Sequence, residues 1–280
     1  MRFQHIDILP PLKGYIERIW IFESGAMLPS DDTKVLVPNG RLLLLLPFQN
    51  GLVGRKADKV YTAYENKMSL VGMTDIPSAI DTQAVGPVGA IGVEFSPAGA
   101  YRVLHLKLNE IKNQVFHLTD ILGKVASAIE QKMGELNNPA DKVRLLQQFF
   151  LTLFTQREED PLFDYCVRKI KLTKGKISVA QLQHETGYSS RWLNIKFEEK
   201  LGLSPKTFNS VIRFQHFYQS IISNPADFWR QKDFYIQYYD ESHFYKDFKR
   251  FTGMSPAKLI QSKNEFGKLF RISTSDFYNT

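Results

Sequence analysis

Phe197-Glu-Glu-Lys-Leu-Gly202-Leu-Ser204-Pro205 is followed later in the chain by Phe248-Lys-Arg-Phe-Thr-Gly253-Met-Ser255-Pro256, a second copy of the same nine-residue pattern. Matched positions are 51 residues apart, and Leu193 and Phe244 keep this offset one helical turn upstream. Two copies are too few for a solenoid, which stacks three or more repeats. The pattern therefore predicts a duplicated supersecondary unit.

Each copy predicts a helix, a glycine stop and a second, serine-capped helix. Leu193, Phe197 and Leu201 recur at the spacing of one helical face, which must be buried against a core. Gly202 follows where a helix ends in left-handed geometry, which glycine adopts without a steric clash. Ser204-Pro205 then supplies an N-cap and a proline at the first helical position. The second copy has the same order of residue types.

The residues upstream of the first copy complete a helix-turn-helix. Ser178-Val-Ala-Gln181 is a capping-box pattern that opens a short helix ending near Glu185. Residues 186–189 form a tight connection that contains Gly187, and Ser189 or Ser190 caps the next helix. Two short helices joined in this way are typical of DNA-binding units whose second helix enters the major groove.

The second copy predicts the same arrangement. Pro225 to Ile236 is expected to form the first helix, residues 237–239 the turn, and Asp240 the cap of the second helix.

The outer faces of the two expected recognition helices differ. The first carries Arg191, Asn194, Ile195 and Glu198, and the second carries Glu241, Ser242, Tyr245, Lys246 and Lys249. Arginine and asparagine match the edges of guanine and adenine. A polar outer face alone is typical of any amphipathic helix, but two copies with the same turn, cap and spacing favour DNA reading.

Charge is distributed unevenly along the 280 residues. Residues 161–280 hold 19 Lys and Arg against 11 Asp and Glu, whereas residues 1–160 hold 17 against 18. The excess of positive charge therefore lies with the repeat, as expected of a segment that neutralises DNA phosphates. A basic segment is also compatible with RNA or a membrane surface.

The first half has the pattern of a β-rich unit. Residues 35–47 read as a strand, a tight turn and a second strand, and residues 67–73 and 88–95 read as further strands bounded by Gly and Pro. A short helix is expected through Leu104, and helices follow near 119–133 and 139–156. The acidic break at 158–161 marks a boundary. We expect an α+β chain: a β-rich, barrel-like domain with two closing helices at 1–160, an all-α double helix-turn-helix domain at 161–262, and a tail at 263–280.

Catalytic patterns are missing from the sequence. His5, His105 and His117 are too scattered for a metal site, and no phosphate-binding glycine loop occurs. Cys166 lies among apolar residues, so a buried structural thiol is favoured over a nucleophile. A single cysteine, together with an N-terminus unlike a signal peptide, predicts a cytoplasmic location. Tyr15, Trp20, Phe22 and Phe48 are core residues or line a ligand cavity, and the sequence leaves both open.

These residues resemble a known family. Gly187-Tyr-Ser-Ser-Arg-Trp-Leu193 with Phe197 and Gly202-Leu-Ser-Pro205 resembles the first helix-turn-helix of AraC/XylS-type transcriptional regulators. Tyr238-Tyr-Asp-Glu-Ser-His-Phe244 with the second nine-residue copy resembles the second. The resemblance implies that both units enter successive major-groove segments, joined by a long helix over Pro205–Ile222. It also implies base-facing roles for Arg191, Asn194, Ile195, Ser242, Tyr245 and Lys246.

The resemblance is incomplete in the second unit. The family usually has alanine before the turn and glycine in it, where this chain has Asp233 and Gln237. Pro11–Trp20, Val37–Gly40 and Phe95–Ala100 resemble the β-rich domain of some of these regulators more weakly. Such domains sense small molecules or dimerise, and these motifs name no ligand.

We therefore predict a sequence-specific DNA-binding transcriptional regulator that is not an enzyme and has no cofactor or metal. Its partners would be double-stranded DNA and the transcription machinery, not a membrane; a small-molecule effector and a homodimer stay open. The alternatives are a nucleic-acid-directed repair enzyme and a non-specific architectural DNA binder. The DNA-contacting candidates are Ser190, Arg191, Asn194, Ile195, Glu241, Ser242, Tyr245 and Lys246, with Lys206, Lys249 and Lys258 on phosphates.

Overall fold

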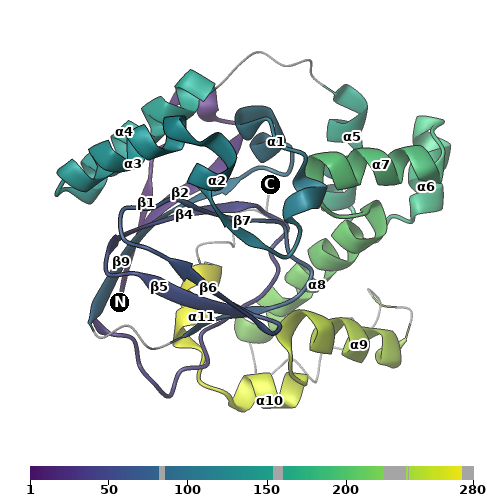
Figure 1. The fold of residues 1–280 in the computed structure, drawn as a ribbon. Helices are drawn as coiled ribbons and strands as arrows, with labels where there is room; N and C mark the ends of the chain where they lie inside the picture. Colours follow the sequence, from purple (N-terminus) through teal and green to yellow (C-terminus); the bar gives the residue numbers. More distant parts are fainter. Residues whose placement is uncertain (82–85, 154–159, 224–237, 239, 273–280) are drawn as a thin grey trace.

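The computed structural model describes residues 1–81, 86–153, 160–223, 238 and 240–272 (Figure 1). Two antiparallel sheets form the N-terminal part. The six-stranded sheet has the order β1 (Arg2–Ile6), β2 (Ile16–Met27), β9 (Pro87–Phe95), β4 (Leu43–Gln49), β7 (Ser69–Val71) and β10 (Val115–His117). The four-stranded sheet has the order β3 (Val35–Leu36), β8 (Ser78–Asp81), β5 (Leu52–Lys56) and β6 (Lys59–Ala63).

Short helices accompany the sheets. They are η1 (Pro10–Leu12), α1 (Gly99–Leu104), η2 (Leu108–Ile111), α2 (Leu118–Leu122), α3 (Lys124–Glu135) and α4 (Pro139–Leu153). Figure 1 shows α3 and α4 at one end of the β-rich part, and α4 packs against η1 and α1.

The six-stranded sheet is buried on both faces because its side chains alternate between two cores. In β2, Ile19 and Ile21 pack in a cluster with the helices α1 to α4. Trp20 and Phe22, which point to the other face, lie in a second cluster with Leu52 of β5. A period of two along a strand sends neighbours to opposite faces, so the same strand supplies both cores.

The helical part contains α5 (Pro161–Leu172), α6 (Val179–Thr186), α7 (Ser190–Leu201), α8 (Pro205–Ser223), α9 (Glu241–Thr252) and α10 (Pro256–Gln261). Its core gathers the apolar stripes of these helices, including Phe197, Phe208, Phe214 and Phe248, each almost fully buried. Helix α8 contacts α5, α7 and α9 and so connects the two halves of this part (Figure 1).

The segment after α10 returns to the β-rich part. Helix α11 (Glu265–Ile272, yellow in Figure 1) contacts β3, and Phe266 lies in the core formed with Trp20 and Phe22. Asn264 exchanges two hydrogen bonds of 3.1 Å with the backbone of Val35. The sequence left the role of this tail open, and the structure places its first residues against the sheets.

The α+β class, with β-rich and helical parts in this order, is confirmed. The barrel-like expectation needs refinement, because no strand pairing among the described residues joins the two sheets into a closed barrel. The strands expected around 35–47 also do not pair with each other: β3 belongs to one sheet and β4 to the other. The helix expected at 225–236, its turn positions 237 and 239, and Asp233 lie outside the described residues.

Candidate nucleic-acid interface

The first helix-turn-helix is built by local hydrogen bonds that the sequence predicts. Ser178 and Gln181 form the capping box at the start of α6, with bonds of 3.1 and 2.8 Å. Helix α6 ends at Thr186, and Gly187 takes the left-handed conformation at φ 74°. Of the two cap candidates, Ser189 is the N-cap of α7; its side chain accepts a hydrogen bond from the Trp192 N–H at 3.2 Å.

Helix α7 then presents one buried and one outer face. Leu193, Phe197 and Leu201 are at most 1% exposed, and Gly202 ends the helix at φ 78°. On the outer face Arg191 is exposed, Ile195 is 53% exposed, and Ser190 and Asn194 are half-buried. The four expected DNA-contacting residues of this unit therefore lie at or near the surface of one helix.

Helix α9 repeats this construction. Asp240 caps it by accepting a hydrogen bond from the His243 N–H at 2.7 Å, Phe244 and Phe248 are buried, and Gly253 ends it at φ 75°. The outer candidates lie in the first two turns of the helix. Two of them, Glu241 and Lys246, are charged, and the other two are Ser242 and Tyr245. Tyr245 is 36% exposed.

A buried ion pair that the sequence did not indicate attaches α9 to α8. Asp247 is 7% exposed and lies 3.4 Å from Arg213 of α8. The guanidinium of Arg213 also lies 4.9 Å from the ring centroid of Tyr238. The only sequence signal for this contact is the position of Asp247 next to the apolar residues of the buried face of α9.

The phosphate candidates are exposed cations at helix ends. Lys206 follows the first residue of α8, Lys249 lies in the last turn of α9, and Lys258 lies in α10.

The contacts between the helical and β-rich parts use other faces of α7 and α9. On α7, Glu199 meets the Tyr101 hydroxyl at 3.5 Å, and a Cβ at Gly202 would lie 2.6 Å from the Leu108 carbonyl oxygen. On α9, Arg250 pairs with Asp75 at 2.6 Å. Helix α1, η2 and the loop between β7 and β8 therefore contact α7 and α9, and the candidate DNA-contacting residues stay at the surface.

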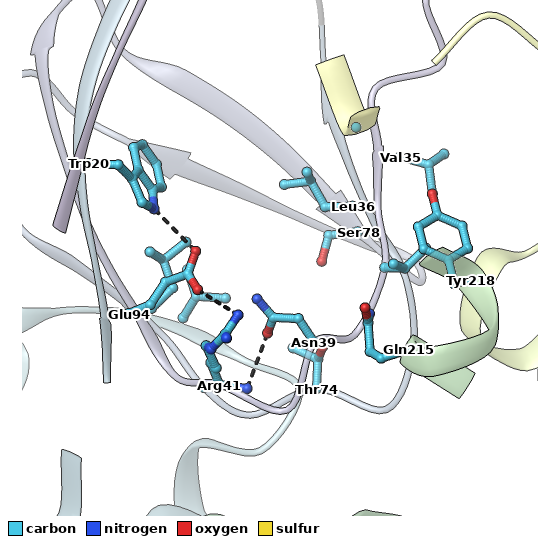
Figure 2. A pocket seen from close by; sticks show the side chains of 15 residues that line it. Trp20, Val35, Leu36, Asn39, Arg41, Thr74, Ser78, Glu94, Gln215 and Tyr218 are labelled. Atoms are coloured by element: carbon cyan, nitrogen blue, oxygen red, sulfur yellow. Dashed lines mark hydrogen bonds and ion pairs between the residues drawn. The ribbon is translucent and has the colours of Figure 1, made fainter. Parts of the chain in front are cut away.

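A cavity of about 110 Å³ lies where the two sheets meet α8 and α11 (Figure 2). Figure 2 shows Trp20, Glu94 and Arg41 on one side and Gln215 and Tyr218 on the other. Of the four aromatic residues that the sequence left undecided, Trp20 lines this cavity; Phe22 is core, and Tyr15 and Phe48 pack against the core beside the helices.

Charged groups beside the cavity form a connected set. Glu94 accepts hydrogen bonds from Trp20 Nε1 at 3.2 Å, from Arg18 at 3.0 Å and from Arg41 at 3.1 Å. Arg41 also donates to Glu17 at 2.6 Å, and Glu17 accepts from Lys171 of α5 at 3.3 Å. Burial lowers the pKa of Lys171, while Glu17 acts in the opposite direction.

Cys166 is fully buried, as the sequence favoured, and burial raises the pKa of its thiol to about 11. Within the described ranges, no cluster of three or more metal-ligating side chains occurs. No described helix is long and apolar enough to cross a membrane.

The chain is similar to one protein-family model and, distantly, to solved structures. Residues 5–117 match the model of a domain of unknown function (DUF6597). An apo ToxT variant from Vibrio cholerae is 12% identical with a TM-score of 0.48, covering 88% of this chain and 98% of its own. ToxT bound to an unsaturated fatty acid is 12% identical with a TM-score of 0.45, covering 88% and 95%. The AraC-like transcriptional activator CuxR is 14% identical with a TM-score of 0.25, covering 81% and 87%.

The structural neighbours thus include an AraC-like regulator, the class that the two repeated motifs resemble. At these identities and TM-scores the likeness is distant and defines no activity for this chain. A search of curated proteins gives no match.

Proposed function

We propose that the chain is a cytoplasmic, sequence-specific DNA-binding transcriptional regulator without catalytic activity. The observation that carries this proposal is the pair α7 and α9: two helices with the same cap, apolar stripe and left-handed glycine stop, each with an outer face at the surface. The outer faces carry different side chains, which suits one chain reading an asymmetric DNA site through two major-groove segments.

The residue roles follow from side-chain chemistry. Arg191 and Asn194 would read base edges, and Ile195 would contact a thymine methyl group. In the second unit Glu241, Ser242, Tyr245 and Lys246 would face the groove. Lys206, Lys249 and Lys258 would contact phosphates and so set the position of the protein on the duplex.

Selection of bound sequences from random DNA tests the proposal as a whole. We expect a two-part motif whose parts are separated by about one helical turn, roughly 10 base pairs. Recovery of sequences without any shared motif would favour the non-specific architectural binder and contradict base reading.

Substitution of Arg191 tests one reading residue. Arg191→Ala should weaken binding to the selected site by about 1–3 kcal/mol and relax the preference at one base pair, with little change on random DNA. Lys206→Ala is the matched control, because loss of a phosphate contact should weaken both DNAs alike and lower the salt slope by about 1. Equal weakening of both DNAs by Arg191→Ala would remove its base-reading role.

The rival proposal, a repair enzyme, would need a reactive thiol or a metal. The raised pKa of the buried Cys166 thiol disfavours the first. Cys166→Ala should retain full binding to the selected DNA, and metal analysis of the purified protein should find no stoichiometric zinc. A repair activity that is lost in folded Cys166→Ala would support the rival.

The remaining expectations form part of the same proposal. Residues 1–160 would sense a small molecule or dimerise, residues 161–262 would bind DNA, and contact with the transcription machinery would follow. Sedimentation with and without the selected DNA would show whether the regulator acts as a monomer or a homodimer.

A further inference from the structure

We propose that the loop between α5 and α6 is a further DNA contact, in which Lys174 and Lys176 bind phosphates of the backbone segment that passes between α7 and α9. This inference rests on the proposed function and adds to it the stretch of DNA between the two half-motifs. None of the phosphate candidates predicted from the sequence, Lys206, Lys249 and Lys258, lies in this loop.

Local contacts fix the loop against α8. Lys174 takes the left-handed conformation at φ 56°, and Gly175 follows at φ 71°. A Cβ at Gly175 would lie 2.3 Å from the carbonyl oxygen of Asn209, so the two backbones touch. The Asn209 side chain also donates a hydrogen bond of 2.7 Å to the Ile177 carbonyl. The backbone that carries the two lysines is therefore held firmly, while Lys174 and Lys176 themselves are exposed.

Arg213 of α8 brings this loop next to α9. Its guanidinium donates a hydrogen bond of 3.2 Å to the Gly175 carbonyl and another of 3.4 Å to Asp247 of α9. One side chain thus joins the loop that opens the first helix-turn-helix to the helix that the second unit presents. The two loop lysines flank Gly175 in the sequence, so they lie where the two units meet.

The loop lysines extend a polar face of α8. Lys206, Arg213 and His216 are spaced i, i+7 and i+10, which places them on one side of the helix, and none of them is buried. Burial, and after it the charges of Lys174 and Lys176, lower the pKa of His216 to about 4. Both lysines therefore lie close enough to this face to make its potential more positive.

This face lies between the two helices that would read DNA. Near the start of α8, Phe208 packs against Phe197 of α7, with ring centroids 6.3 Å apart. Further along, Phe217 packs against Phe244 of α9 at 4.5 Å. If α7 and α9 enter successive major-groove segments, the backbone between those segments must pass the stretch of α8 that the loop borders.

The charges of the loop are available for DNA. Two lysines of the preceding helix α5 are already paired, Lys169 with Glu185 and Lys171 with Glu17. The two loop lysines have no ion-pair partner among the described residues. A DNA phosphate would supply the counter-charge, and release of the ions condensed on DNA favours such a contact. The loop also leads directly into α6, and the first helix of a helix-turn-helix crosses the DNA backbone.

Removing the charge of individual phosphates tests the contact. Duplexes with the complete selected site are made with uncharged methylphosphonate linkages between the two half-motifs, or with the same number of these linkages outside the site. We expect the wild type to bind the first duplex about fivefold or more weakly than unmodified DNA, because the phosphates that the lysines neutralise are gone. The second duplex should bind like unmodified DNA.

Variants of the loop show which side chains cause this sensitivity. Lys174→Gln/Lys176→Gln should bind the unmodified site about fivefold or more weakly and no longer distinguish it from the modified duplex. Lys174→Arg/Lys176→Arg keeps both charges and should keep the sensitivity. Lys124→Gln/Lys132→Gln removes two exposed charges from α3 and should behave like the wild type. A glutamine variant of the loop that unfolds like the wild type and stays as sensitive would refute the contact.

A salt titration on random DNA separates this inference from the proposed function. The slope of log binding constant against log salt should be smaller by about 1.8 in the glutamine variant of the loop, 0.9 for each lost phosphate contact, and unchanged in the α3 control. If selection yields no shared motif, the proposed function fails, and the salt slope still decides whether the loop contacts phosphates. A selected motif with an unchanged slope would leave base reading intact and reject the lysine contact.

Discussion

At the scale of single residues, Lys56 is a buried charge without a local partner. Its side chain lies at the end of β5, is 3% exposed, and its Nζ makes no hydrogen bond to any described residue. Burial lowers the pKa of its amine from the ordinary 10.5 to about 8, and the charge of Asp75 only partly compensates. A lysine with a lowered folded-state pKa destabilises the fold wherever it must be protonated.

Lys56→Met should therefore stabilise the protein at pH 7. The wild type loses stability as pH falls from 10.5 through 8, and below 8 the full cost is present, up to about 3 kcal/mol. The gain should shrink as pH rises towards 10.5, because the amine is then neutral in both states. Urea unfolding of both proteins at pH 7 and pH 10 measures this; an equal gain at both pH values would assign it to packing instead.

Single residues were predictable where their chemistry is local and unpredictable where a distant partner decides their role. Arg191 and Ile195 are on the outer face of α7, as helical spacing requires. The sequence left open whether Trp20 is a core residue or lines a cavity, because its position depends on Glu94. Glu94 lies 74 residues away and accepts a hydrogen bond from the Trp20 indole N–H. Glu94 and Arg41 carry no motif that would have predicted their pairing.

At the scale of elements, the boundaries of α6, α7 and α9 agree with the sequence because caps and stops are made by neighbours, whereas the single helix expected near 119–133 is divided at Gly123 into α2 and α3. Ser178, Ser189 and Asp240 each accept a hydrogen bond from an N–H three residues ahead. Glycines 202 and 253 end α7 and α9 in left-handed geometry. The strands agreed less well, since pairing is non-local: β3 and β4 are close in sequence but joined different sheets.

The capping box of α6 gives a prediction at this scale. Ser178→Ala removes the acceptor for the Gln181 N–H and should lower the free energy of unfolding by about 0.5–2 kcal/mol. Ser178→Asp retains an acceptor at the same position and should stay within a few tenths of a kcal/mol of the wild type. Chemical denaturation distinguishes them. An equal loss of unfolding free energy in both variants would mean that Ser178 stabilises the protein by something other than accepting the Gln181 N–H.

At the scale of the whole molecule, the β-rich and helical parts are connected by contacts that lie far apart in the sequence. Asp75 and Arg250 are 175 residues apart, and Glu17 and Lys171 are 154 apart. Neither the cavity nor the docking of α11 was predictable, because each needs several elements whose relative positions only the packed chain defines. The sequence did predict the two parts themselves, since each has its own period of apolar residues.

Gly267→Ala tests the docking of α11. A Cβ there would lie 2.5 Å from the Val35 carbonyl oxygen and 2.4 Å from Asn264, so α11 must shift; we expect a loss of about 1–3 kcal/mol. Gly134→Ala, in α3, meets nothing within 4 Å and should be neutral or stabilising by up to about 1 kcal/mol. Thermal unfolding and limited proteolysis after Ser262 provide the measurements. Intact docking in Gly267→Ala would show that the contact at Val35 is not required.

The return of α11 to the sheets also has a consequence for biosynthesis. Asp31 and its partner Lys263 are separated by 232 residues. At about 5–20 residues per second, a ribosome needs roughly 10 to 50 seconds to make the intervening chain. Until then Trp20 and Phe22 lack the ring of Phe266 that completes their core. The core of the β-rich part is therefore completed last. A translation product that stops after α10 would contain α7 and α9 but leave this core open to chaperones and proteases.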